Sequence, residues 1–240
     1  MLSATSALKS ALPNSMLALI KDFLRKSGLY LVVSDLAGIP RLIRWLAGGC
    51  PAPSPPAIKR RIVRAYLQQY GLKVFVETGT FYGDTLSYIA KTGARCFSVE
   101  LSAPLYEKAR ARFRGNPAVK LYLGDSRTVL GQIVDPLREP ALFWLDGHFS
   151  GGETARGTGD TPIAHELELL LNRSGGERDV VLIDDARCFD GTGDYPHLSE
   201  IILRVSKIPG RRIEVSNDII RLTPQLPAHN ESLRRLEDAV

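Results

Sequence analysis

The stretch Glu77-Thr78-Gly79-Thr80-Phe81-Tyr82-Gly83-Asp84-Thr85 decides the fold expected for this chain. It follows the apolar run Val74–Val76, which is bounded by turn residues and is too short for a helix. Gly79 and Gly83 permit a tight turn and a close backbone approach to a ligand, ahead of a helix N-terminus. The stretch therefore predicts a strand, a ligand-binding turn and a helix in succession.

The same alternation continues along the chain. Further apolar runs expected as strands are 96–99, 119–123, 141–145 and 180–183, followed by a hairpin of 212–215 and 218–222 around a turn at Ser216-Asn217. Patterns of helical period lie between the runs, for example Leu105, Ala109 and Phe113. Short strands that alternate with helices predict βαβ units, and strands that are apolar throughout are expected when both faces are covered. The chain is therefore expected to adopt an α/β fold with a doubly wound, mainly parallel sheet.

Four prolines within residues 51–56 indicate a stiff linker. Residues 1–50 are expected to form an N-terminal helical extension, residues 57–223 the main domain, and residues 224–240 a polar tail. The extension is amphipathic, which is typical of a helix docked on a core, as a lid or as a homodimer contact. Attachment to a membrane surface is the alternative.

The composition fits a soluble globular protein. The 240 residues are 44% apolar and 24% charged, and no segment is apolar for long enough to span a bilayer. The chain has 31 basic and 26 acidic residues, so its net charge is +5. This is a mild excess, and no nucleic-acid partner is expected. The three cysteines, Cys50, Cys96 and Cys188, are far apart in the sequence and odd in number, and no signal peptide is visible. A reducing, cytoplasmic location is therefore predicted.

Acidic residues end the expected strands or follow them directly. They are Glu77, Glu100, Asp125, Asp146 and Asp184. In a parallel sheet the carboxyl ends of the strands meet at one edge, where ligands bind. The sequence therefore predicts an acidic ligand site at that edge.

The glycine turn does not suit a dinucleotide. A dinucleotide-binding loop has the pattern G-x-G-x-x-G, and Phe81 stands where its middle glycine belongs. Glu77 would also repel a pyrophosphate, whereas it suits the ammonium of S-adenosylmethionine. Glu100 lies 21 residues after Gly79, where a carboxylate can accept both ribose hydroxyls. Asp125 is placed to accept from the adenine amine, or to cap the next helix, or both.

Residues 74–220 resemble class I S-adenosylmethionine-dependent methyltransferases. The shared features are the E-x-G-x-x-x-G loop, the acid that ends the second strand, and Gly-Asp-Ser after the third. The resemblance implies a Rossmann-like sheet of seven mostly parallel strands, the last one antiparallel. It also implies that Glu77 holds the methionine part of the cofactor and Thr85 its carboxylate, with Glu100 on the ribose and Asp125 on the adenine. The cofactor-binding set expected on this basis is Glu77, Gly79, Thr80, Gly83, Thr85, Glu100, Asp125 and Ser126.

Three more carboxylates are expected to converge beside this loop. They are Asp146, after the fourth strand, and the pair Asp184-Asp185, after the fifth. Such a group is costly unless protons or a metal neutralise it, and oxygen ligands suit Mg²⁺, which could orient an acceptor hydroxyl. The pattern is similar to metal-dependent O-methyltransferases that act on catechols and on sugars. It departs from them at Phe149, where the catechol enzymes have a lysine, and at His148, where the sugar enzymes have an acid.

His148 is the candidate general base, together with Asp146 as a catalytic residue; hydrogen bonding to a strand end is the other interpretation of His148. The glycine-rich segment 149–161 is expected to be a lid, in which Glu153, Arg156 and Asp160 are the charged side chains. The function expected is O-methylation of a small molecule or a sugar, with a divalent metal left open. An NAD-dependent oxidoreductase, a metal-dependent hydrolase and a non-catalytic adenosyl-ligand-binding module remain as alternatives.

Overall fold

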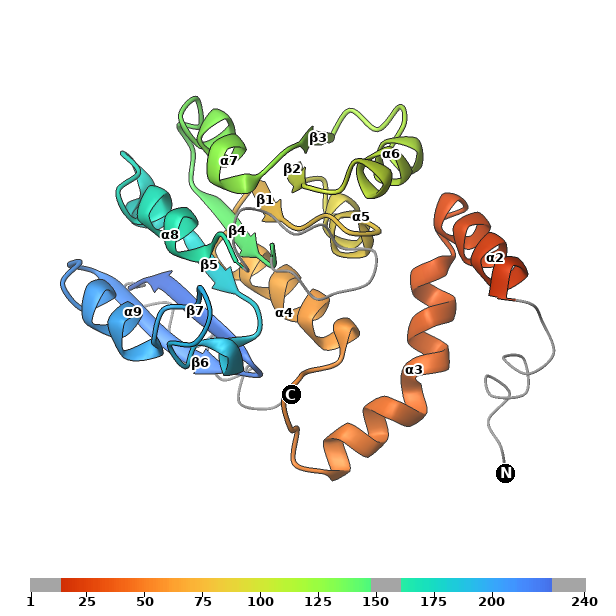
Figure 1. The fold of residues 1–240 in the computed structure, drawn as a ribbon, viewed down its shortest axis with the longest axis horizontal. Coiled ribbons are helices and arrows are strands. Elements are labelled where there is room, and N and C mark those ends of the chain that lie inside the picture. The colour runs from red at the N-terminus through yellow and green to blue at the C-terminus, as the bar shows by residue number, and fades with distance from the viewer. Residues whose placement is uncertain (1–13, 148–160, 226–240) are drawn as a thin grey trace. The chain divides into compact units, whose positions relative to one another are not determined.

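The computed structural model describes residues 14–147 and 161–225 (Figure 1). The chain divides into two compact units between Pro51 and Ala52. This point lies inside the proline-rich segment 51–56.

The first unit contains α2 (Asn14–Lys26) and α3 (Tyr30–Ala47). The two helices are held together at their junction, where the Arg25 guanidinium lies 4.2 Å from the centre of the Tyr30 ring. Leu19, Phe23 and Leu36 are exposed, so the surface of this helix pair carries apolar side chains. Among the described residues, no helix is both long enough and apolar enough to cross a membrane.

The second unit is built on a seven-stranded sheet with the order β3-β2-β1-β4-β5-β7-β6. The strands are β1 (Val74–Thr78), β2 (Arg95–Glu100), β3 (Val119–Leu123), β4 (Ala141–Leu145), β5 (Val180–Ile183), β6 (Arg211–Ser216) and β7 (Ile219–Pro224). The first five pair in parallel, whereas β7 runs antiparallel to both β5 and β6. The expected sheet, mostly parallel with an antiparallel last strand, is confirmed.

The turn of the closing hairpin differs from the expected one by one residue. Ser216 is paired with Ile219, and the two turn residues are Asn217 and Asp218, with φ of 55° and 63°. A two-residue hairpin loop with both φ values positive matches the twist of the strands, and Asn and Asp tolerate this conformation. The expected turn at Ser216-Asn217 was therefore wrong.

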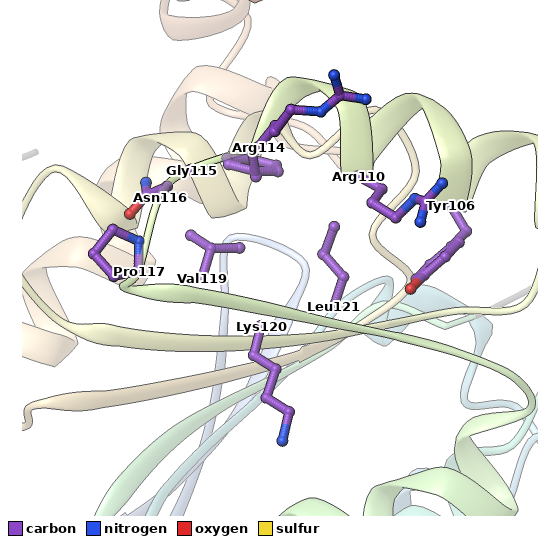
Figure 2. Close-up of a pocket in the computed structure, with 10 residues that line it drawn as sticks. Tyr106, Arg110, Arg114, Gly115, Asn116, Pro117, Val119, Lys120 and Leu121 are labelled. Atoms are coloured by element: carbon purple, nitrogen blue, oxygen red, sulfur yellow. The ribbon is translucent and has the colours of Figure 1, made fainter.

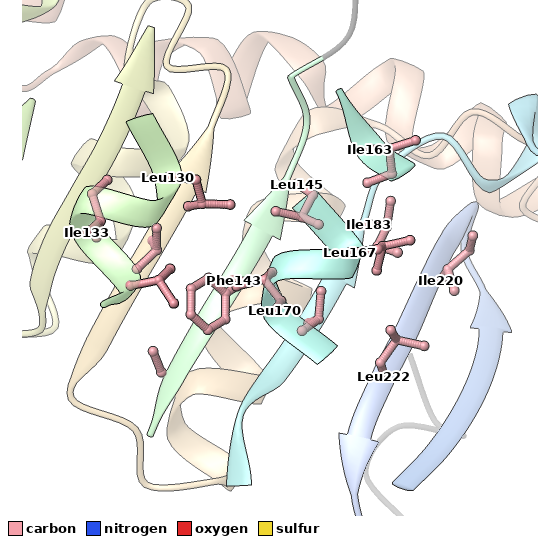
Figure 3. Close-up of a cluster of buried hydrophobic side chains, with 14 of the residues drawn as sticks. Leu130, Ile133, Phe143, Leu145, Ile163, Leu167, Leu170, Ile183, Ile220 and Leu222 are labelled. Atoms are coloured by element: carbon pink, nitrogen blue, oxygen red, sulfur yellow. The ribbon is translucent and has the colours of Figure 1, made fainter. Parts of the chain in front are cut away.

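Helices cover both faces of the sheet (Figure 1). They are α4 (Pro56–Gln69), α5 (Asp84–Ala90), α6 (Ala103–Arg112), α7 (Ser126–Val134), α8 (Ile163–Leu171) and α9 (Leu198–Val205). Side chains of β4 alternate between two cores: Phe143 and Leu145 pack with α7, α8 and α9, while Leu142 and Trp144 pack with α4 and α5. Figure 3 shows the first core, with Leu130 on α7 and Leu167 on α8 against the sheet. Burial on both faces explains why the central strands β4 and β5 are apolar throughout.

Pairing in register brings the carboxyl ends of the central strands together. Thr78 at the end of β1 pairs with Val99 on one side and Leu145 on the other. Beyond the strand ends, the backbone N–H of Asp146 donates to Thr78 O at 3.1 Å and that of Asp184 to Leu145 O at 3.0 Å. The connections after β1, β4 and β5 therefore start side by side.

Candidate active site

Glu77 is buried near the end of β1, with 2% of its surface exposed. Ser98 on the neighbouring strand donates to Glu77 Oε1 at 2.8 Å, and the Thr80 hydroxyl lies 2.5 Å from the Ser98 hydroxyl. Burial raises the pKa of Glu77 well above its ordinary value; Asp146 and Glu100 add repulsion, and the Ser98 bond opposes it. A cation placed against Glu77 would restore its charge, so this position is electrostatically prepared for a positively charged group.

Glu100 holds the turn after β1 in place. Its Oε2 accepts from the backbone N–H of Phe81 at 2.7 Å, and its Oε1 accepts from that of Ser102 at 2.8 Å. Burial raises the pKa of Glu100, while these backbone hydrogen bonds oppose the rise. Each carboxylate oxygen has a further lone pair, so Glu100 can accept from ligand hydroxyls while it orders the turn.

Gly79 and Gly83 are both required by the structure. Gly79 has φ of 85°, and a Cβ there would lie 2.5 Å from the carbonyl oxygen of Asp146. Gly83, with φ of 70°, precedes α5, and a Cβ there would meet the Phe113 ring at 2.6 Å. The close approach expected of these glycines is thus made by neighbouring parts of the chain. Thr85 follows in the first turn of α5 and is half-buried.

Asp125 caps α7, as one of its two expected roles requires. Its Oδ1 accepts from the backbone N–H of Arg127 at 3.0 Å, and its Oδ2 accepts from the Arg127 guanidinium at 2.8 Å. The Arg127 side chain accordingly lowers the pKa of Asp125. Ser126, the first residue of α7, is buried beside it.

Glu166 on α8 is a buried acid that the sequence did not single out. It is 1% exposed, and one of its carboxyl oxygens has no hydrogen-bond partner among the described residues. Burial raises the pKa of Glu166 to about 7, an effect that the hydroxyls of Ser126 and Thr78 oppose. The carboxyl group therefore lies between the end of β1 and the start of α7, next to Ser126, which is one of the predicted cofactor contacts.

Asp184 and Asp185 are buried directly after β5, and both are bound by Lys59 from the first turn of α4. The Lys59 ammonium lies 2.6 Å from Asp184 Oδ1 and 3.1 Å from Asp185 Oδ1. The Arg187 guanidinium donates to the same Asp185 oxygen at 2.8 Å. Two cationic side chains thus occupy oxygens that the sequence assigned to a metal ion.

Electrostatic coupling places Asp146 at the centre of this group. It is half-buried, and its charge acts on both Glu77 and Asp184. Burial raises the pKa of Asp184, and repulsion by Asp146 adds to the rise, while Lys59 opposes it. Burial alone would lower the pKa of Lys59, but its two carboxylate partners raise it, so the ammonium stays charged.

The predicted metal ligands do not fit a divalent ion in this arrangement. Across residues 14–147 and 161–225, no group of three His, Cys, Asp or Glu side chains is arranged to hold a metal. One oxygen of each carboxylate, Oδ1 of Asp184 and Oδ1 of Asp185, is instead in contact with the Lys59 ammonium, and the Asp185 oxygen also accepts from the Arg187 guanidinium. Metal ligation by Asp146, Asp184 and Asp185 stays a prediction.

His148 and the expected lid lie outside the described residues, as do Glu153, Arg156 and Asp160. Residues 189–195, which follow the Asp184-Asp185 pair, are described, and there the Tyr195 ring lies 5.2 Å from that of Phe189. Burial raises the pKa of Tyr195 to about 12, and the charges of Asp185 and Asp146 contribute to the rise. Tyr195 is therefore an uncharged phenol close to the carboxylates.

A separate hollow of about 590 Å³ lies between α6 and β3 (Figure 2). Its lining includes Tyr106, Arg110 and Arg114 but none of the predicted cofactor-binding residues. Figure 2 shows Leu121 pointing toward α6 and Lys120 pointing away from it. The hollow is distinct from the acidic edge.

Some residues of the site could be recognised from the sequence and others could not. Ser98 could have been noticed, because it is the one polar residue within the apolar run 96–99. Lys59 and Glu166 lie in helices whose charged positions look like ordinary solvated faces, so no local signal marks them. Their importance follows from contacts between distant parts of the chain.

No family model and no curated protein sequence matches the chain. Solved structures match it at low identity. An O-methyltransferase from Bacillus cereus in complex with SAH is 18% identical, with 76% of this chain and 88% of that chain covered and a TM-score of 0.53. The O-methyltransferase TomG from Streptomyces achromogenes, involved in tomaymycin synthesis and solved with SAM, is 15% identical, with 75% and 85% covered and a TM-score of 0.53. The SAH-bound methyltransferase PaMTH1 from Podospora anserina is 14% identical, with 93% and 97% covered and a TM-score of 0.53. The chain therefore has the fold of the class I S-adenosylmethionine-dependent methyltransferases, as its sequence resemblance implies.

Proposed function

We propose that this protein is an S-adenosylmethionine-dependent methyltransferase that transfers a methyl group to a hydroxyl of a small molecule or a sugar. The observation that carries the proposal is the buried Glu77 carboxyl at the acidic edge, whose pKa is raised well above its ordinary value by burial and by neighbouring acids. A buried acid in this state is stabilised by a cationic ligand. S-adenosylmethionine carries both an ammonium and a sulfonium, whereas a dinucleotide would bring a pyrophosphate.

Glu100 and the α7 start supply contacts of the right kind for the adenosyl part. Glu100 can accept from the two ribose hydroxyls with the lone pairs that its backbone partners leave. Asp125 and Ser126 stand at the start of α7, where the adenine is expected. Both Asp125 oxygens already accept from Arg127, so the adenine amine would have to share one of them with the Arg127 side chain. Thr80, Thr85 and the two glycines complete the proposed cofactor site.

The methyl acceptor is proposed to lie over Asp146, with His148 as the general base. The donor is already activated by its sulfonium charge, so the protein needs mainly to align the acceptor hydroxyl and to remove its proton. An imidazole suits the second task because its ordinary pKa is close to neutral pH. A bound divalent ion would orient the acceptor and lower the pKa of its hydroxyl, but Lys59 and Arg187 contact the Oδ1 atoms of Asp184 and Asp185 that the ion would need.

A homodimer formed through α2 and α3 is part of the proposal, and it is supported by the apolar side chains that the first unit leaves uncovered. The three cysteines are free thiols, which supports a reducing, cytoplasmic location.

Titration calorimetry with S-adenosylmethionine, SAH and NAD⁺ tests the proposal. We expect micromolar binding of the first two and no binding of NAD⁺ at millimolar concentration. Transfer of a radiolabelled methyl group to catechols and glycosides then tests turnover. Binding of NAD⁺ in preference to SAH would overturn the cofactor assignment, and SAH binding without transfer to any hydroxyl acceptor would favour a non-catalytic binding module.

A further inference from the structure

Lys59 lies beside Asp184 and Asp185 at the carboxyl ends of the strands, and the proposed function gives it no role. It stands on α4, which precedes β1 in the chain, and its ammonium is 126 residues away in sequence from Asp185. The three side chains are largely shielded from solvent, with 14% of Lys59, 5% of Asp184 and 8% of Asp185 exposed. A shielded ammonium between two carboxylates is a strong and well-directed interaction.

The backbone around the pair is shaped to present both carboxylates. Asp185 adopts a left-handed conformation with φ of 57°, and its N–H donates to Asp184 Oδ1 at 2.8 Å. The next residue donates its N–H to Asp218 O at 2.9 Å, which ties the turn to the β6–β7 hairpin. The linker before α4 is tied to the same hairpin, since the Ser54 hydroxyl donates to Asn217 O at 2.9 Å. Lys59 and the two aspartates are therefore held from both sides.

A divalent ion and the Lys59 ammonium would compete for the same oxygens. A metal bound by the Asp184 and Asp185 Oδ1 atoms would need lone pairs that face the ammonium at 2.6 and 3.1 Å. The metal ion and the ammonium would then both be in contact with the same carboxylate oxygens, and two cations that close repel each other strongly where water is largely excluded. We infer that Lys59 takes the place of a divalent cation at the carboxyl ends of β4 and β5, so that the protein binds no metal there as long as Lys59 is present.

The ammonium has one donor left for a ligand. It has three N–H groups, and among the described residues its only partners are the two carboxylates. The third N–H can therefore donate to an oxygen of the acceptor and orient it, which is the task that a metal would otherwise perform. This last step rests on the proposed function, whereas the exclusion of metal does not.

Binding of Mn²⁺, followed by the electron paramagnetic resonance signal of the free ion, tests the inference on the full-length protein. We expect no binding to the unmodified protein at submillimolar Mn²⁺. Lys59→Met should bind one Mn²⁺ at least about tenfold more tightly, because the competing positive charge is gone. Arg61→Met is the matched control, since it removes a positive charge from an exposed position on the same helix; it should behave as the unmodified protein.

Two results would overturn the inference: micromolar binding of Mn²⁺ by the unmodified protein, or no tighter binding in Lys59→Met. Lys59→Gln provides a second neutral variant in case the methionine variant fails to fold, and the first result needs no variant. SAH binding measured on the same samples separates this inference from the proposed function. A protein that binds SAH and also binds Mn²⁺ tightly refutes only the role of Lys59, and one that binds neither refutes only the cofactor assignment.

Discussion

At the amino ends of β4 and β5 the buried charges find partners within the chain, whereas at the carboxyl edge of the sheet the buried Glu77 and Glu100 contact no cationic side chain among the described residues. The amino-end group centres on Asp179, whose carboxylate accepts from Arg173 at 2.5 Å and from the backbone N–H of Ala141 at 2.9 Å. Arg211 donates to the backbone carbonyl of Asp179 and to that of Gly176 at 2.5 Å. Both members of the Arg173–Asp179 pair are almost fully buried.

The carboxyl-end group has the opposite balance. Its acids are Glu77, Glu100, Asp146, Asp184 and Asp185; Lys59 forms ion pairs with Asp184 and Asp185, and Arg187 forms one with Asp185. Removing one partner of a buried ion pair is strongly destabilising, because it leaves the other charge buried and uncompensated. A buried acid without a cationic partner is stabilised in its charged form when a cationic ligand binds. The amino-end group is thus expected to stabilise the fold, and the carboxyl-end group is where we propose that the cationic cofactor binds.

The largest effect is expected from breaking the amino-end pair. Arg173→Met leaves the Asp179 carboxylate buried without its main partner, so the free energy of unfolding should fall by about 3–5 kcal/mol. Urea denaturation measures this loss. Arg95→Met, at an exposed pair with Glu139, is the control and should cost less than about 1 kcal/mol. SAH affinity of the folded Arg173→Met protein should be unchanged, and a parallel loss of affinity would contradict the separation of the two ends.

The next effect concerns pH and Glu166. Burial raises its pKa from 4.5 to about 7, so between these values the folded chain retains a proton that the unfolded chain releases. Stability from this group is therefore fully present at low pH and is lost as pH rises toward 7. Asp125 opposes ionisation of Glu166, while Arg127 and the nearby hydroxyls favour it.

Glu166→Gln removes this dependence. Between about pH 5 and about pH 8 the free energy of unfolding of the unmodified protein should fall by about 2–3 kcal/mol more than that of the variant. The reason is that the glutamine side chain of the variant has no proton to release. Thermal or urea unfolding at the two pH values measures the change. Glu168→Gln, on the exposed side of the same helix, should show no such change. Equal pH profiles for Glu166→Gln and the unmodified protein would mean that Glu166 is ionised in the folded state.

A smaller effect is expected when Glu77 loses its charge. Glu77→Gln keeps the shape and an acceptor for the Ser98 hydroxyl but cannot pair with an ammonium, so SAH affinity should fall about tenfold. Stability should not decrease, because a buried acid without a cationic partner is removed. Calorimetry and urea unfolding measure the two quantities, with the exposed Glu107→Gln as control. Reduced stability with unchanged affinity would place Glu77 among the groups that hold the fold.

The comparison also explains what could be predicted from the sequence. The central strands β4 and β5 were predictable because burial on both faces makes each run apolar on its own, and the acids after them stood out against those runs. The turn at Asn217-Asp218 was misplaced because Ser216, Asn217 and Asp218 are all turn formers, and only the pairing of Ser216 with Ile219 selects among them. Lys59 was missed because its partners lie more than a hundred residues away. The role of His148 stays a prediction.

Asp125 offers the smallest effect and the finest distinction, since it contributes both to the fold and to the proposed adenine contact. Asp125→Ala removes the α7 cap and the Arg127 pair, which should cost about 1 kcal/mol of stability. Asp125→Asn keeps an oxygen that can cap the helix, so its stability should stay within about 0.5 kcal/mol of the unmodified protein. If the carboxylate also accepts from the adenine amine, both variants should bind SAH a few-fold more weakly in calorimetry, because the charge-assisted hydrogen bond is lost in each. Unchanged affinity in Asp125→Asn would make Asp125 only a helix cap, and the acidic edge that serves the ligand would then end at Glu100.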